Sequence, residues 1–275
     1  MDRLSDDELS ALARLLAPDR RLTAMVLRDA GFSAELLPSG ARTSLEYWSV
    51  VNDLIVDGLL ADGRARLLAA VATHFPHHPV LRPDRPAAWR VLFLGASPRG
   101  LAGLRPDREL RELLALPGLE VTYRPAAAAT DLAAVRTARP HVLHLACHGH
   151  GPRLTFEDPG GEPQSVHAAD LAETLALYAA GTGARLRGIV LSCCTGGEAA
   201  ALLAPHADEV IAHRDDLDDN HAVRFSQALY RTLPETGSLV QAARLAAADL
   251  VLADPALRPL RDGLTLHPAA ADARR

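Results

Sequence analysis

The hydrophobic positions of the chain follow two different patterns. Up to about residue 78, apolar residues recur every three or four positions, and this spacing predicts amphipathic helices. Beyond residue 89, short continuous apolar runs alternate with helical stretches, which predicts buried parallel strands with helices between them. We therefore expect a small all-α helical bundle followed by an α/β domain.

The first part of the chain is expected to contain four helices. Ser5 and Glu8 form a capping box, in which each side chain binds the backbone amide of the other residue, and this predicts the first helix start. Gly31 ends the second helix, because glycine readily adopts the left-handed conformation found after a helix. The third and fourth helices are expected at 43–60 and 64–74. None of them carries a cluster of catalytic residue types.

Three histidines near the end of this part, His74, His77 and His78, could be interpreted as a metal site. The alternative is a polar helix terminus, where the helix dipole favours cationic side chains, and we adopt this simpler interpretation. Residues 79–88 hold three prolines, which predict a stiff and extended linker, placed at 82–88.

The second part of the chain alternates strands with helices. Strands are expected at 90–96, 119–124, 142–147, 188–193 and 209–213, and a weaker pattern at 264–268 could add another. Helices are expected at 104–116, from 130 onward, and at 165–177, 196–203, 221–233 and 238–252. A hairpin is expected around the Pro-Gly-Gly sequence at 159–161. This alternation predicts a mostly parallel sheet with helices on both faces.

Two of these strands end in residues with catalytic potential. His148 and Gly149 follow the strand at 142–147, and Cys194 follows the strand at 188–193. In an open α/β sheet the working groups lie just beyond the carboxyl ends of the strands. We therefore expect His148 as a general base and Cys194 as a thiol nucleophile, side by side at one rim. The backbone amides of Gly149 and Cys194 would form an oxyanion hole.

Cys194 is the more suitable of two adjacent cysteines. It is expected at a turn from strand to helix, where the helix N terminus favours the thiolate that acts as a nucleophile. Neighbouring residues of a strand point to opposite faces, so only one of Cys193 and Cys194 can face the cleft. Cys193 and Cys147 are then expected to be small buried hydrophobic residues.

Composition excludes several classes of function. Hydrophobic residues make up 48% of the 275 residues, which indicates a folded chain, and a net charge of -5 does not favour nucleic-acid binding. All 29 basic residues are arginine, which excludes a lysine Schiff base and a Walker-type phosphate lysine. The sequence lacks the serine-hydrolase elbow and the glycine fingerprint of dinucleotide binding. We expect no cofactor and no bound metal.

The sequence also predicts a location. Three cysteines, two of them adjacent, cannot build a disulfide framework, which fits a reducing compartment. The acidic N terminus lacks the apolar region of a signal peptide, and no apolar stretch is long enough to cross a bilayer. These features predict a cytoplasmic protein that does not bind membranes.

The second part of the chain resembles the CHAT family, the caspase-like cysteine peptidases related to separases. The segments that carry the resemblance are 91–98 with 107–112, 140–149, 190–197, and 212–217 with 222–230. The resemblance implies a caspase-like fold and endopeptidase activity on a protein substrate. It also implies that His148 and Cys194 are the catalytic pair. The histidine precedes the cysteine by nearly the ~50 residues that are typical of caspase signatures.

Residues 1–81 resemble the first type of effector-associated domain found in bacterial conflict systems. The helix of Trp48, the segment 62–68 and the segment 74–79 carry this resemblance. It implies a helical adaptor domain that pairs with a matching domain on an adaptor or sensor protein. An ordinary helical lid on the catalytic domain is the alternative. With the linker at 82–88 and the peptidase domain at 89–275, the resemblance implies an effector of a bacterial defence system.

Two other functions stay open on the residues alone. One is a non-catalytic scaffold that keeps the caspase-like fold for interaction. The other is a metal-binding protein, because zinc favours histidine and cysteine, and the candidate ligands are His144, Cys147, His148, His150, Cys193 and Cys194. Against the metal site, His144 and Cys147 are expected to point to opposite faces of one strand.

The loop at 214–220 is unusually acidic. In related folds, acidic residues near this position help to select a basic residue before the scissile bond. The resemblance therefore implies that Asp215 or Asp216 binds the substrate, with a solvated acidic loop as the alternative.

Overall fold

The computed structural model describes residues 3–16, 19–33, 35, 37–38, 41–76, 78, 80–81 and 88–268. It contains two compact units, Met1–Ala88 and Trp89–Arg275. The first is helical and the second combines a central sheet with helices. Apart from Ala88, the linker that we expect at 82–88 lies outside the described residues.

The first unit is a bundle of helices, α1 (Asp6–Leu16), α2 (Arg20–Ala30), α3 (Ser44–Val56) and α4 (Gly63–His74). Their apolar stripes meet in one core, where Leu12, Val26, Trp48 and Leu67 are each at most 1% exposed. Gly31 ends α2 in the left-handed conformation, with a φ of 96°, as expected. The expected small all-α bundle is confirmed.

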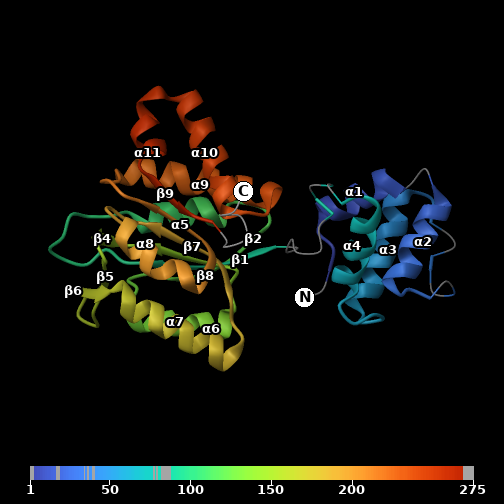
Figure 1. Ribbon diagram of the computed structural model, residues 1–275, viewed down its shortest axis with the longest axis horizontal. Coiled ribbons are helices and arrows are strands. Elements are labelled where there is room, and N and C mark those ends of the chain that lie inside the picture. The colour runs from blue at the N-terminus through green and yellow to red at the C-terminus, as the bar shows by residue number, and fades with distance from the viewer. Residues whose placement is uncertain are drawn as a thin grey trace. The chain divides into compact units, whose positions relative to one another are not determined.

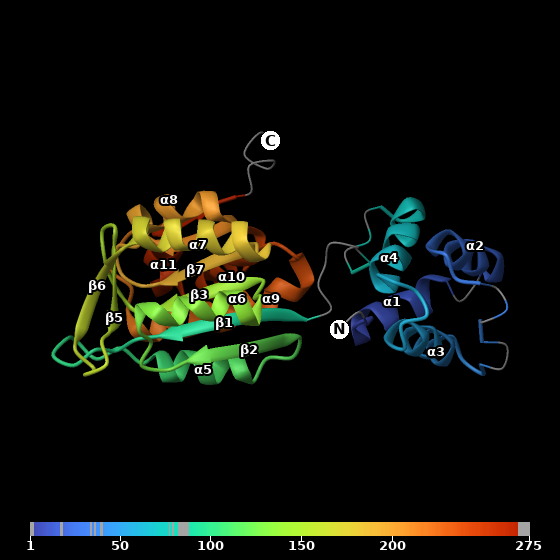
Figure 2. The ribbon, with the colours of Figure 1, turned by 90° about the horizontal axis from the view of Figure 1, so that it is seen from below.

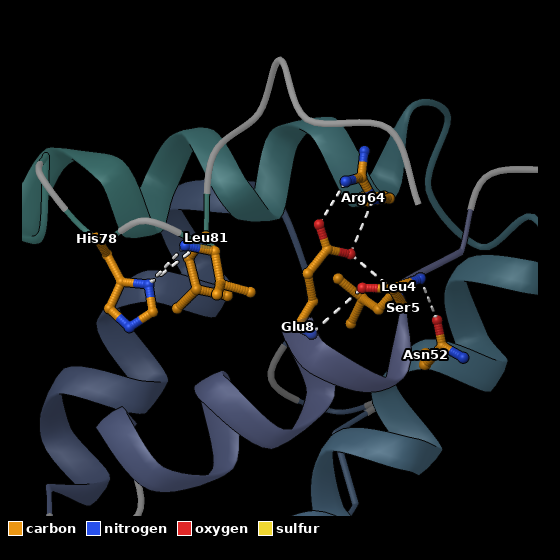
Figure 3. A network of polar contacts seen from close by, with 8 residues as sticks. Leu4, Ser5, Glu8, Asn52, Arg64, His78 and Leu81 are labelled. Atoms are coloured by element: carbon orange, nitrogen blue, oxygen red, sulfur yellow. Dashed lines mark hydrogen bonds and ion pairs between the residues drawn. The ribbon is translucent and has the colours of Figure 1, made fainter. Parts of the chain in front are cut away.

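A buried ion pair joins the first and last helices of this bundle (Figure 3). Glu8 is completely buried, and its carboxylate accepts hydrogen bonds from Arg64 Nε (3.1 Å) and Nη2. The carboxylate also accepts from the Ser5 amide (2.9 Å), while Ser5 Oγ accepts from the Glu8 amide (3.3 Å). The capping box is therefore confirmed. Its glutamate is also the counter-ion of Arg64, which the local sequence pattern could not reveal.

His78, close to the end of this unit, contacts backbone atoms (Figure 3). Its Nδ1 accepts from the amides of Val80 (3.3 Å) and Leu81 (3.2 Å), and so it caps the turn after α4. His77 lies outside the described residues. Across the described ranges, no group of three or more His, Cys, Asp or Glu side chains is arranged to hold a metal ion. The contacts of His78 give it a structural role that needs no metal.

A six-stranded sheet with the order β2-β1-β3-β7-β8-β9 forms the centre of the second unit. Its strands are β1 (Trp89–Gly95), β2 (Leu119–Arg124), β3 (Val142–Ala146), β7 (Leu186–Ser192), β8 (Ala207–His213) and β9 (Leu264–His267). All neighbouring pairs are parallel except β8 and β9. The expected mostly parallel sheet is confirmed, and the weak pattern at 264–268 is indeed a strand.

Helices cover both faces of this sheet (Figures 1 and 2). One face carries α6 (Ala134–Ala138), α7 (Ala168–Thr182) and α8 (Gly197–Leu203). The other carries α5 (Pro106–Leu114), α9 (Asp219–Thr236), α10 (Leu239–Ala253) and α11 (Arg258–Asp262). Strand residues alternate between the two cores, so Leu143 and Leu145 pack on the first face and Val142 on the second. No helix in the described part of the chain is long and apolar enough to span a bilayer.

A small antiparallel sheet follows β3 and consists of β4 (His148–His150), β5 (Arg153–Glu157) and β6 (Pro163–His167). The hairpin expected around 159–161 joins β5 to β6. The helix expected from Ser165 begins only at Ala168, because Ser165 still pairs with β5. His167 then caps α7 by accepting from the amide two residues later (3.1 Å). Strand β5 does alternate, with Leu154 and Phe156 buried between more exposed neighbours, whereas β4 has three residues, too few to show the pattern.

Candidate active site

The carboxyl ends of two neighbouring strands bring His148 and Cys194 to one edge of the sheet. Strands β3 and β7 are adjacent and parallel, with Ala146 opposite Ser192. The Cys147 amide continues this ladder by donating to Ser192 O (3.3 Å). His148 and Cys194 each come two residues after the last paired positions, and both line the same cavity.

Gly149 allows the two segments to approach closely. A Cβ at this position would lie 2.5 Å from the backbone oxygen of Cys194 and 2.8 Å from the sulfur of Cys193. Real Cβ atoms do not come so near, so a larger residue would push the strand of His148 away from the cysteine turn. Gly149, which we expect at the oxyanion hole, is thus also the point where the strand of His148 contacts the turn of Cys194.

Thr195 fastens the turn after Cys194 to the strand of His148. Its Oγ1 donates to Gly149 O (3.3 Å) and accepts from the Gly151 amide (3.3 Å). Its φ of 46° lies in the left-handed region, which β-branched residues rarely adopt. These two hydrogen bonds, with a third from the Thr195 amide to Asp215 O (3.2 Å), hold the strained backbone in place.

The cavity shared by His148 and Cys194 is small. Its volume is about 20 Å³, which is room for about one water molecule. Leu217, Asp219 and Glu109 are among the other residues that line it. A side chain of a bound peptide would not fit into this space.

A backbone carbonyl orients the imidazole of His148. Its Nε2 lies 2.9 Å from Ala102 O, and a carbonyl only accepts, so Nε2 carries the proton of this hydrogen bond. In the neutral ring, Nδ1 is then the nitrogen that can accept a proton. A fixed tautomer of this kind is what a general base requires.

Cys194 is the most accessible of the three cysteines, and its sulfur contacts the loop after β8. The Leu217 amide donates to Sγ at 3.4 Å, and Leu217 O lies 3.7 Å from it. Cys147 and Cys193 are buried, with exposures of 1% and 4%. Burial raises the pKa of Cys147 to about 12 and raises the pKa of Cys193 well above its usual value. Both buried thiols are therefore poor nucleophiles.

A buried charged network adjoins the cavity. Glu109, 3% exposed, accepts from Ser192 Oγ (3.1 Å) and Ser226 Oγ. Glu109 Oε1 lies 2.9 Å from His144 Nε2, and His144 Nδ1 lies 3.0 Å from the Tyr230 hydroxyl. Burial by itself would raise the pKa of Glu109, but the charge of His144 and the hydrogen bonds outweigh burial and hold this pKa below its usual value. The network ties α5, α9, β3 and β7 together beside the site.

The acidic loop places one carboxylate at the cavity, and it is neither of the two expected. Asp215 and Asp216 are exposed, and Asp215 lies 3.4 Å from Arg214. Asp219 lines the cavity instead and accepts a hydrogen bond from the Arg105 amide (3.1 Å). The structure therefore brings together His148, Gly149 and Cys194, and leaves Asp215 and Asp216 at the surface.

Several residues at the site were not identified from the sequence. Glu109 offered one signal, because it lies one helical turn before Leu113 on the buried stripe of α5, where a carboxylate is unexpected. Ala102 and Leu217 contact the site through backbone atoms, which every residue type has, so the sequence cannot single them out. Asp219 is the first residue of α9, and its place at the cavity depends on how α9 packs beside β7, which the sequence does not show.

The alternative ligand set for a metal is divided between the two faces of the sheet. His144 stacks on Phe93, with 4.8 Å between ring centroids, and is bound to Glu109. Cys147 and Cys193 belong to the core on the opposite face. His144 therefore cannot join the two buried cysteines around one ion.

These features define an α/β domain with a histidine and a cysteine at one sheet edge, preceded in the chain by a helical bundle. The chain belongs to the CHAT domain family, whose match spans residues 61–260. Residues 2–85 match effector-associated domain 1. Both resemblances seen in the sequence are thereby confirmed.

A curated relative, a Roc-COR-CHAT protease from an unknown prokaryotic organism, is 27% identical over 157 residues. The match covers 52% of this chain and 15% of the relative. A secreted C11 cysteine protease from Bacteroides thetaiotaomicron, solved with an irreversible peptide inhibitor, has a TM-score of 0.41 at 11% identity and 59% coverage of both chains. A cobalamin-binding protein from Desulfitobacterium hafniense DCB-2 has a TM-score of 0.23 at 15% identity, covering 67% of this chain and 83% of that one.

Proposed function

We propose that this protein is a cysteine endopeptidase in which His148 and Cys194 act as a pair. The observation that carries the proposal is that both side chains line one cavity at adjacent strand ends, while Ala102 fixes the histidine tautomer. Membership of the CHAT domain family and similarity to a Roc-COR-CHAT protease support the same activity.

In the proposed reaction, His148 Nδ1 takes the proton of the Cys194 thiol, and the sulfur attacks the carbonyl carbon of the peptide bond. The amides of Gly149 and Cys194 stabilise the oxyanion, at ~3 kcal/mol for each donor. The C–N bond then breaks, and His148 gives its proton to the leaving amine. A water molecule, deprotonated by His148, hydrolyses the thioester and restores the thiol.

A non-catalytic scaffold is the second candidate, and one observation favours it. The cavity holds about one water molecule, and Leu217 contacts the sulfur, so a peptide carbonyl has no space in this conformation. Peptidase activity therefore requires the loop at 214–218 to move away from Cys194. The two candidates differ in whether a peptide electrophile can reach the sulfur.

Covalent labelling of the full chain with a thiol-directed peptide electrophile tests the peptidase. We expect one label, located at Cys194 by mass spectrometry. Labelling should be lost in Cys194→Ala, strongly slowed in His148→Ala and kept in Cys193→Ala, which is the matched control because Cys193 is buried. Labelling that survives in Cys194→Ala, or is absent from the natural protein, would favour the scaffold.

The proposed substrate is a protein, and the first unit recruits the peptidase within a bacterial defence system. The match of residues 2–85 to effector-associated domain 1 supports this role. The test uses full-length Cys194→Ala as bait in a lysate of the source organism. Enrichment of an adaptor or sensor that itself carries a matching helical domain is expected, and its absence among the captured proteins would contradict recruitment through this unit.

The preference for a basic residue before the scissile bond is a separate part of the proposal. Asp215 and Asp216 are exposed and could reach a substrate that lies over the loop. If they select an arginine or lysine, a peptide library should show that preference, and Asp215→Asn with Asp216→Asn should abolish it. A library without any basic preference removes this role.

A further inference from the structure

A second cavity lies between α5 and the carboxyl ends of β1 and β2. Its volume is about 350 Å³, within the roughly 300–1,000 Å³ typical of ligand sites. Most of its lining is apolar, with Phe93, Leu104, Pro106, Leu110, Leu114 and Pro125. Leu114 is 52% exposed, so this surface is open to solvent.

The charged residues that line this cavity are mostly engaged with neighbours. Glu157 accepts from the Ser97 amide (2.8 Å), and Asp107 accepts from Arg105 Nε (2.9 Å) and Nη2 (2.8 Å). The side chain of Arg111 is 75% exposed to water. With its carboxylates already paired, the cavity favours an apolar occupant over a charged one.

This cavity adjoins the candidate active site. Leu104 and Pro106 line both the apolar cavity and the small cavity of His148 and Cys194. The smaller one, at about 20 Å³, accepts no side chain, whereas the larger one, at about 350 Å³, can take a leucine or an aromatic ring. Because the two cavities share Leu104 and Pro106, a peptide bound at Cys194 would lie next to the apolar cavity.

We infer that the apolar cavity is a specificity subsite that takes an apolar side chain of the peptide being cut. The inference rests on the proposed peptidase function and deepens it, because it names a chemical class of substrate residue. Burying an apolar side chain in such a pocket gives on the order of tenfold discrimination, so substrates with leucine, methionine or phenylalanine at one position should react faster.

The test measures labelling rates of the full chain with aza-peptide Michael acceptors, which carry variable residues on both sides of the reacting carbon. We expect the natural protein to favour apolar residues at one position by about tenfold over serine or asparagine. Leu114→Gln should remove most of this preference. Leu114→Trp should narrow the cavity and shift the preference towards smaller apolar residues.

Leu245→Gln is the matched control. Leu245 is 50% exposed on α10, close to the 52% of Leu114, and it does not line the apolar cavity. Labelling without an apolar preference, or the same rates in Leu114→Gln and Leu245→Gln, overturns the subsite and leaves the peptidase intact. An equal fall for every probe shows that the substitution disturbs the reaction as a whole and not one subsite, and it also overturns the inference. Absence of labelling in the natural protein overturns both proposals.

Discussion

Each of the two units contains a buried glutamate that contacts a basic side chain and at least one serine. Glu8, in the first unit, pairs with Arg64, whose guanidinium is always charged. Glu109, in the second, pairs with His144 at 2.9 Å, and it also lines the cavity of the candidate site. The first network holds helices together, whereas the second connects the stability of the fold to the geometry of the site.

Glu109→Ala should have the largest effect. It leaves His144 buried without its counter-ion, which costs about 3–5 kcal/mol, and it removes the anchor of Ser192, two residues before Cys194. We expect that loss in the second unit, measured by denaturant titration, with slower labelling of Cys194. Glu120→Ala, at an exposed position of β2, should stay within about 0.5 kcal/mol. A loss below 1 kcal/mol with normal labelling would make Glu109 an ordinary core residue.

Glu8→Gln should destabilise the first unit by about 3 kcal/mol and leave the labelling rate of Cys194 unchanged. Each unit contains one buried tryptophan, Trp48 in the first and Trp89 in the second. Fluorescence of the Trp89→Phe variant therefore reports unfolding of the first unit, and Trp48→Phe reports the second.

Replacing both partners gives the control for this ion pair. Glu8→Leu with Arg64→Met removes both charges from the core, and it should recover most of the lost free energy of unfolding. If Glu8→Gln also slows labelling of Cys194, the division of roles between the two glutamates is wrong.

The two glutamates also show what the sequence could predict. The capping box identified Glu8, because its partner in that motif, Ser5, lies within one helical turn. His148 and Cys194 could be predicted because each follows a hydrophobic run that predicts a strand. The carboxyl ends of parallel strands meet at one edge of the sheet, where functional groups lie. Arg64 and Glu109 depend on how helices pack, and Ala102 acts through its carbonyl. These contacts arise from tertiary structure, which local patterns do not encode.

Thr195→Val should have a smaller effect, limited to the site. The valine loses two hydrogen bonds that join the cysteine turn to Gly149 and Gly151, at about 1 kcal/mol each. We expect the labelling rate of Cys194 to fall about tenfold, with a change in unfolding free energy of no more than about 2 kcal/mol. Thr195→Ser keeps the hydroxyl and should label at nearly the natural rate. Equal labelling rates for the valine and serine variants would show that the two hydrogen bonds of the Thr195 hydroxyl do not position Cys194.

A last prediction concerns how the stability of the second unit depends on pH. Burial, with the charges of Arg90 and Arg187, lowers the pKa of His141 to about 4, and its Nδ1 accepts from the Arg90 amide (3.1 Å). Burial also lowers the pKa of His213 to about 4, against the opposing charges of Asp215 and Glu109. Because the unfolded chain binds these protons near pH 6.5, stability is full above that pH and falls towards pH 4.

This slope should appear in the fluorescence of Trp89, which reports the second unit. His141→Asn keeps an acceptor for the Arg90 amide but cannot be protonated, so it should flatten the slope between pH 6.5 and 4 without changing stability at pH 8. A slope that stays the same in His141→Asn would assign the acid sensitivity to His213, the other histidine whose pKa burial lowers to about 4.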